Sequence, residues 1–251
     1  RMAAFVLRPH VAEFVDVVGD GRPDLYDLSS GCDPNDPEEG GCDPNTIGPD
    51  ALLETRDDGF ADRSSLVPHD PRWTHDHKLV AVGIDCDGDD DVVIISSPEF
   101  FPTEQNRVLV NRVNEGLGFE ATFPPDLLHV IGDLYDIDAG DVDGDGLPDV
   151  AFSSCTNDDS NFGEWLLRSD DGTLVDDSAA LPSRTVSCTV GVAVVDLDDD
   201  GDLDLVYGGT AAFEDTHTLM RVFVNKGDGT FADGSSALPA FSGSEGHLML
   251  N

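Results

Sequence analysis

Asp141-Val-Asp-Gly-Asp-Gly-Leu-Pro-Asp149 recurs in altered form as Asp196-Leu-Asp-Asp-Asp-Gly-Asp-Leu-Asp204. Each stretch has aspartate at positions 1, 3, 5 and 9 and glycine at position 6. Calcium takes about six to eight oxygen ligands, and alternate side chains of a tight loop can point at one centre. Without a cation, carboxylates this close would repel one another. The spacing therefore predicts two calcium sites, with side-chain ligands Asp141, Asp143, Asp145 and Asp149, and Asp196, Asp198, Asp200 and Asp204.

The residues around these loops are typical of strands rather than of the helices of an EF-hand. An EF-hand needs a bidentate glutamate at position 12 of its loop, where this chain has Phe152 and Tyr207. A short apolar segment follows each loop, and β-branched residues with partial alternation precede it. We therefore expect each loop to be the turn of a β-hairpin. An acidic turn that binds no metal is the alternative.

The pattern occurs twice more in weaker form. Asp16-Val-Val-Gly-Asp-Gly-Arg-Pro-Asp24 has Val18 at position 3, which predicts weaker binding or a water in the gap. Asp85-Cys-Asp-Gly-Asp-Asp-Asp91 has Asp90 in the place of the glycine and reaches the next strand two residues early. Asp91 is then the candidate for the closing ligand, and the occupancy of both loops stays open. The candidate side-chain ligands are Asp16, Asp20, Asp24, Asp85, Asp87, Asp89 and Asp91.

A second series of turns has nearly the same period as the acidic loops. These turns contain Phe60, Phe119, Leu174 and Phe231, which lie 59, 55 and 57 residues apart. The first residues of the acidic loops lie 69, 56 and 55 residues apart, and the longest interval contains an insertion. Each unit thus reads strand, acidic loop, strand, variable loop, strand, turn and strand, which is typical of a propeller blade.

We therefore predict an all-β chain, with residues 1–251 forming one β-propeller domain or a segment of one. It would have about four four-stranded blades plus partial strands at both ends. The repeats are expected at about residues 10–70, 76–128, 129–183 and 186–241, with an acidic, Cys-bounded insertion at 29–50.

These motifs resemble the FG-GAP/VCBS repeat family, which includes the propeller of the integrin α-subunit. The resemblance rests on the acidic loops, on the Asp-Leu-Val or Asp-Val-Ala strand after them, and on Asn225-Lys-Gly-Asp-Gly-Thr-Phe231. It implies a calcium-binding β-propeller whose loops join the first two strands of each blade. It also implies that the carbonyl of position 7 binds the metal, which by position adds Leu147, Asp202 and Arg22.

Charge and hydropathy narrow the range of partners. The net charge is -39, from 13 basic and 52 acidic residues. This balance argues against nucleic acid and anionic membranes as partners, because phosphate groups are bound mainly by lysine and arginine. It fits secretion into a salty or calcium-rich medium, where salt screens self-repulsion, and it fits an ordinary acidic surface equally well. No stretch approaches the run of about 18 apolar residues of a membrane helix, so we expect no direct membrane insertion.

The five cysteines point to disulfides. Cys32 and Cys42 bound the acidic insertion, where a disulfide would stiffen a segment with no hydrophobic residue to bury. Cys155 follows the second strand of one repeat and Cys188 precedes the first strand of the next, positions that suit a bridge between neighbouring blades. Cys86 then remains, either free or intermolecular. Zinc is the alternative, but the spacings match no zinc ribbon or finger.

We therefore predict a secreted or cell-surface calcium-binding module with a structural, adhesion or interaction role, whose partner is a protein, a glycan or copies of itself. The metals are expected to be structural. The alternatives are a lectin, and a subunit of an extracellular filament joined by strand exchange at the unmatched ends. We expect no enzyme, because Gly-x-Ser-x-Gly, a phosphate-binding glycine loop and His-Glu-x-x-His are all absent. A polysaccharide lyase on the same propeller is the alternative that stays open; it would need a basic or tyrosyl proton acceptor, and the chain has three tyrosines.

Overall fold

The computed structural model describes residues 9–29, 50–70, 76–96, 105–130, 133–155, 163–170, 172–182, 188–209 and 220–238. These segments include the four acidic loops and the strands on either side of them. Cys32 and Cys42, and the partial strands expected at the two ends, lie outside the described residues.

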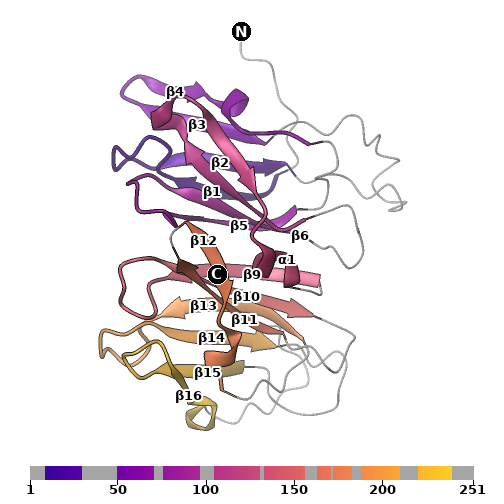
Figure 1. The fold of residues 1–251 in the computed structure, drawn as a ribbon, viewed down its shortest axis with the longest axis vertical. Coiled ribbons are helices and arrows are strands. Elements are labelled where there is room, and N and C mark those ends of the chain that lie inside the picture. The colour runs from indigo at the N-terminus through magenta and orange to yellow at the C-terminus, as the bar shows by residue number, and fades with distance from the viewer. Residues whose placement is uncertain are drawn as a thin grey trace, which may run out of the picture. The chain divides into compact units, whose positions relative to one another are not determined.

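The described fold consists of four antiparallel sheets of four strands each (Figure 1). Within a sheet the strands follow one another in chain order. Sheet A contains β1 Pro9–Val15, β2 Asp24–Ser29, β3 Ala51–Arg56 and β4 Gly59–Asp62. Sheet B contains β5 Asp76–Val82, β6 Asp91–Ser96, β7 Arg107–Arg112 and β8 Gly118–Thr122. Sheet C contains β9 Asp133–Gly140, β10 Asp149–Cys155, β11 Glu164–Asp170 and β12 Thr173–Asp176. Sheet D contains β13 Thr189–Val195, β14 Asp204–Gly209, β15 Met220–Asn225 and β16 Phe231–Asp233.

The sheets lie in two compact units, which we describe separately. Unit 1 comprises Arg1–Val82 and Gly88–Phe123 and contains sheets A and B. Unit 2 comprises Gly83–Asp87 and Pro124–Asn251 and contains sheets C and D. In each unit the first strand of one sheet contacts the first strand of the other, β1 with β5 and β9 with β13.

Each unit has one main hydrophobic core between its two sheets. Strand residues alternate between the two faces of a sheet, so one apolar face of each sheet is available to the other. The core of unit 1 includes Val17, Tyr26, Leu52, Val92, Leu109 and Phe119. The core of unit 2 includes Val142, Leu166, Leu205, Tyr207, Phe223 and Phe231. These features confirm the prediction of an all-β chain built from four-stranded, propeller-like blades.

The helical elements of the described residues are short: α1 Pro125–His129, η2 Ser64–Leu66, η3 Val113–Glu115, η4 Ser178–Ala180 and η5 Ser235–Ala237. The sequence did not predict α1. It begins at Pro125 in the first helical position, where the missing N–H removes no intrahelical bond. It also ends before a helical period could become visible in the sequence.

A disulfide joins the two sheets of unit 2. Cys155 ends β10, Cys188 directly precedes β13, and their sulfur atoms are bonded. The positions of the two cysteines in the sequence had suggested this bridge between neighbouring blades. Cys86 is free and exposed.

Candidate metal loops

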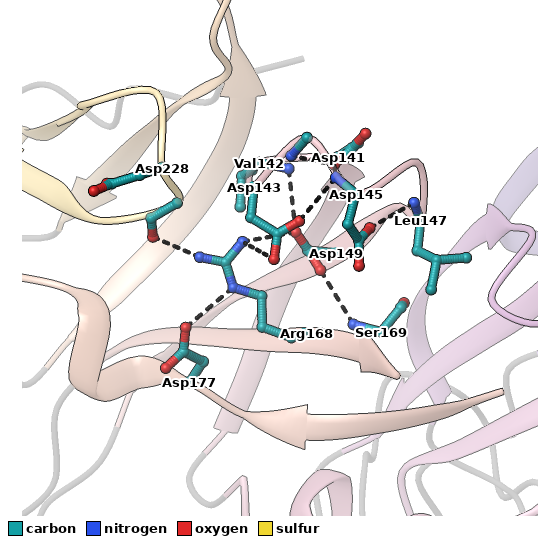
Figure 2. A network of polar contacts seen from close by, with 12 residues as sticks. Asp141, Val142, Asp143, Asp145, Leu147, Asp149, Arg168, Ser169, Asp177 and Asp228 are labelled. Atoms are coloured by element: carbon teal, nitrogen blue, oxygen red, sulfur yellow. Dashed lines mark hydrogen bonds and ion pairs between the residues drawn. The ribbon is translucent and has the colours of Figure 1, made fainter. Parts of the chain in front are cut away.

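The acidic loop of sheet C is held in shape by its own backbone N–H groups (Figure 2). Asp141 accepts hydrogen bonds at Oδ1 from the N–H of Gly144 (2.7 Å) and Asp145 (3.1 Å), and at Oδ2 from Gly146 (2.9 Å). Asp145 in turn accepts from the N–H of Leu147 at 2.8 Å. Gly144 and Gly146 have φ values of 76° and 93°, a region that side-chain-bearing residues rarely adopt. The first carboxylate therefore sets the loop's geometry.

The loop of sheet D has the same construction. Asp196 accepts from the N–H groups of Asp200 and Gly201, each at 3.1 Å, and Asp200 accepts from Asp202 at 3.0 Å. The fourth position is Asp199, with φ 61°, and the sixth is Gly201, with φ 98°. Aspartate is one of the few residues with a side chain that adopts this left-handed region readily. The two loops thus fold alike without identical sequences.

In each of these two loops three carboxylates converge. One oxygen from each of Asp141, Asp143 and Asp149 lies within 4.8 Å of the others, and the same holds for Asp196, Asp198 and Asp204. In the part of the chain that the structure describes, these are the two groups of at least three metal-ligating side chains. The fifth-position aspartates, Asp145 and Asp200, are not members of these groups.

The donor set of both groups fits a hard cation. All of the converging atoms are carboxylate oxygens, without thiol or imidazole, and this composition suits calcium rather than a soft transition metal. The acids also affect one another's protonation. Loss of solvation and the charges of Asp200 and Asp204 raise the pKa of Asp198. A divalent cation would offset this crowding of negative charge.

The ninth aspartate has a structural role in all four sheets. These aspartates are Asp24, Asp91, Asp149 and Asp204, and all are buried. In each, Oδ1 accepts a backbone N–H from the third strand, donated by Thr55 at 2.6 Å, Asn111 at 2.8 Å, Ser169 at 3.1 Å and Asn225 at 2.8 Å. Burial raises the pKa of Asp149, although the charge of Arg168 acts in the opposite direction. The ninth aspartate thus ties each loop to its sheet independently of any metal.

In the loop of sheet B, the residues occupy other loop positions than those that the sequence predicted. Asp91 pairs with Val82, just as the ninth residue of every other loop pairs with the residue before that loop. The positive φ values fall on Cys86 (62°) and Gly88 (99°), which makes these the fourth and sixth positions. Gly88 is therefore the loop glycine, and the placing of Asp90 in that position was wrong.

In the corrected frame the first position is Gly83, which has no carboxylate. Asp85 and Asp87 become positions 3 and 5, Asp89 becomes position 7, and Asp91 becomes position 9. The strand after this loop therefore does not begin early. The loop is degraded because it lacks the first carboxylate, the group that receives the loop's own N–H bonds in the other three sheets.

In the loop of sheet A an arginine supplies positive charge. Arg22, at position 7, donates from Nε to Asp20 at 2.8 Å, and its Nη2 lies 2.7 Å from the same carboxylate. This contact lowers the pKa of Asp20. Arg22 also pairs with Asp57 at 3.0 Å. With Val18 at the third position, this loop has fewer carboxylates and one arginine beside them.

Hydrogen bonds from asparagine link the loop of one sheet to the next sheet. In unit 2, the amide of Asn225 donates to Val142 O in the loop of sheet C at 2.7 Å. In unit 1, Asn111 donates to Val17 O in the loop of sheet A at 2.8 Å. Asn225 begins the Asn-x-Gly-Asp-Gly-Thr-Phe motif, so a signal for it was present in the sequence. Arg168, which contacts the loop of sheet C, has no such signal.

Comparison with known proteins places these observations in context. A model of the FG-GAP-like repeat matches residues 83–152 and 141–207. No curated protein matches the chain. A solved structure of an Agrocybe aegerita lectin, described for its specific recognition of non-reducing terminal N-acetylglucosamine, has a TM-score of 0.56 and 19% identity. The match covers 88% of this chain and 51% of that chain, so this chain spans about half the lectin's length. At this identity the likeness is one of fold.

None of the helices in the described segments is long and apolar enough to cross a membrane.

Proposed function

Because the chain belongs to the FG-GAP-like repeat family, we propose that it is a calcium-binding interaction module whose metal ions stabilise the loops of sheets C and D. The observation that carries this proposal is the convergence of three carboxylates in each of these loops, within 4.8 Å. The repeat family and the oxygen donor set support calcium as the ion. Position 7 would add the carbonyl oxygens of Leu147 and Asp202.

The metals in this proposal are structural. Each loop joins the first two strands of its sheet, and its carboxylates repel one another in the absence of a cation. An ion that binds the folded loop and not the unfolded chain adds to stability by mass action. The module itself then offers a rigid frame on which a partner can be recognised. Its disulfide supports an extracellular setting, and its net charge of -39 is compatible with one.

Thermal unfolding with and without calcium tests the proposal. Calcium at about 100 times its dissociation constant should add roughly 2.7 kcal/mol per occupied site, which raises the melting temperature by several degrees. EDTA should reverse the shift. A double variant, Asp143→Asn with Asp198→Asn, should lose the response to calcium. A melting temperature that calcium and EDTA both leave unchanged would mean that the loops do not bind the ion.

The control is a charge change outside the loops. Asp58→Asn with Asp170→Asn also removes two negative charges, but from exposed positions outside the loops. This variant should keep the full response to calcium, which would separate loss of a ligand from a change of net charge.

Glycan binding is a second candidate for the module's role, favoured by the fold shared with the Agrocybe aegerita lectin. A glycan array with the calcium-loaded protein tests it, with N-acetylglucosamine-terminated glycans as the first probes. Binding that competes with free sugar would support a lectin. A blank array, with the protein shown to be folded on the same day, would leave protein recognition as the module's role.

A further inference from the structure

Arg168 places a positive charge against one of the two candidate calcium loops. It lies in β11 and is mostly buried, with 12% of its side chain exposed. Its Nη1 lies 2.8 Å from Asp149 Oδ2 and 3.6 Å from Asp143 Oδ2, so it contacts two of the three converging carboxylates (Figure 2). The positively charged guanidinium thus lies beside the same carboxylates that a bound cation would use.

Further contacts on other sides hold this guanidinium in place. Its Nε lies 3.1 Å from Asp177, and its Nη2 donates to Gly229 O, in the turn before β16, at 2.6 Å. The turn packs closely against the loop and the arginine, because a Cβ on Gly229 would lie 2.6 Å from Asp143 Cβ and 2.7 Å from Arg168 Nη2. Arg168 therefore cannot swing away from the loop without losing these contacts.

The loop of sheet D has a different residue at the position that corresponds to Arg168. Arg168 precedes Ser169, and the residue that corresponds to Ser169 in sheet D is Asn225, because both donate to the ninth aspartate. The position of Arg168 is therefore taken by Val224. Among the described residues, no ion pair reaches Asp196, Asp198 or Asp204. The two loops thus have similar sets of carboxylates, but in the described part of the chain only the set in sheet C has an arginine beside it.

We infer that Arg168 lowers the calcium affinity of the loop of sheet C, so that the loop of sheet D fills first. This inference rests on the proposed calcium binding and adds to it a determinant of affinity. A unit charge about 5 Å from a divalent cation opposes its binding roughly tenfold even at the dielectric constant of water. Arg168 acts on the metal through its charge and through the carboxylates it holds, so it is a positioning residue rather than a ligand.

Variants in which only one of the two candidate calcium loops is intact, called single-loop proteins below, give the first test. Asp198→Asn leaves the loop of sheet C intact, and Asp143→Asn leaves the loop of sheet D intact. Calcium titration calorimetry of the two should give a dissociation constant at least about tenfold lower for the loop of sheet D. Equal affinities, or a tighter loop in sheet C, would overturn the inference.

Substitution of Arg168 gives the second test. In the Asp198→Asn background, Arg168→Met should tighten calcium binding about tenfold, and the gain should shrink as salt rises from low to about 0.5 M. Arg168→Lys keeps the charge and should stay within about threefold of the parent. Arg112→Met, which removes an exposed arginine paired with Glu115 and Glu120 in sheet B, is the matched control and should change little. Equal gains in the Met and Lys variants would contradict a role for charge.

The outcomes separate this inference from the proposed function. If neither single-loop protein takes up calcium, the proposed function fails. If both bind calcium and Arg168→Met leaves the affinity unchanged at low salt, the inference fails while the proposed function stands. A fall in calcium-free stability alone, with unchanged affinity, would assign Arg168 a purely structural role and also overturn the inference.

Discussion

The side-chain amide of Asn225 donates one hydrogen bond to Val142 O at 2.7 Å and another to Leu203 O at 2.9 Å. The first acceptor lies in the loop of sheet C and the second in the loop of Asn225's own sheet. One buried side chain therefore holds the loops of two consecutive blades together. Ser169, at the corresponding position of sheet C, reaches a carbonyl of its own loop, that of Pro148, at 2.5 Å.

Replacement of Asn225 by serine should therefore remove the link between sheets and keep the local one. We expect Asn225→Ser to lower the free energy of unfolding by about 1 to 2 kcal/mol, because Val142 O loses a buried donor. Asn225→Asp should cost more, since a carboxylate would face two carbonyl oxygens. Urea unfolding measures both. Asn114→Ser is the control: this asparagine is exposed, donates to Asp89 at 2.8 Å and reaches Val18 O only at 3.4 Å, so its loss should cost less than either. If Asn225→Ser were as stable as the parent, the link between the sheets would contribute nothing to stability.

Gly229 should tolerate no side chain. Its φ is 72°, and an added Cβ would meet Asp143 and Arg168 at under 3 Å. We expect Gly229→Ala to destabilise by about 3 kcal/mol, from backbone strain and steric overlap together. Gly116→Ala supplies the strain alone, because Gly116 has φ 80° and open space around it. It should cost about 1 kcal/mol. Equal losses in denaturant unfolding would show that the turn can move away from the loop.

The period of the sequence was enough to predict the sheets. Aspartates and glycines recur at fixed positions between strand-like segments, and such local signals can be recognised without knowledge of tertiary contacts. The carboxylates of the loops of sheets C and D were predicted for the same reason. The frame of the loop of sheet B was not, because acids stand at alternate positions from Asp85 to Asp91. They fill three ligand positions in either frame, positions 1, 3 and 5 counted from Asp85 or positions 3, 5 and 9 counted from Gly83, and only the glycine at position 6 favours the second frame.

The role of Asp145 as a ligand stays a prediction: it fits the spacing, while its carboxylate receives the N–H of Leu147 and is not among the three that converge. The contact that the sequence missed has a tertiary cause. Arg168 looks like an ordinary strand residue until the fold brings it to the loop of sheet C. Contacts of this kind depend on how sheets pack and leave no periodic trace in the chain.

Asp27 should make stability depend on pH in the direction opposite to that of an ion-paired acid. It is 7% exposed, its Oδ1 has no hydrogen-bond partner among the residues that the structure describes, and burial raises its pKa. A carboxyl whose pKa is higher in the folded state keeps its proton better when folded, so stability is greatest below the ordinary aspartate pKa and falls as pH rises through the raised value.

Replacement of Asp27 by asparagine tests this dependence. Asp27→Asn should raise the free energy of unfolding at pH 7 by about 1 kcal/mol, because no buried charge remains. The gain should vanish near pH 3, where Asp27 is protonated in both states. Urea unfolding at several pH values, with Asp58→Asn as an exposed control, measures it. A gain that does not change with pH would point to packing instead of charge.

The buried ion pair between Asp76 and Arg107 should be the most costly single pair to break in unit 1. Two bonds of 2.8 Å and 2.6 Å join the carboxylate to the guanidinium, and the side chains are only 2% and 1% exposed. Asp76→Asn removes the negative charge that makes both bonds to the buried guanidinium, a loss that typically costs about 3 to 5 kcal/mol. Glu120→Gln, which weakens the exposed pair with Arg112, should cost less than about 1 kcal/mol.

A double variant separates the value of the pair from the cost of a lone charge. Asp76→Leu with Arg107→Met removes both charges and keeps apolar volume, so it should recover much of the stability that Asp76→Asn loses. The comparison uses the free energy of unfolding in urea at pH 7. If the double variant were less stable than Asp76→Asn, the attraction within the pair would outweigh the cost of burying it, and the pair would itself be a net source of stability for unit 1.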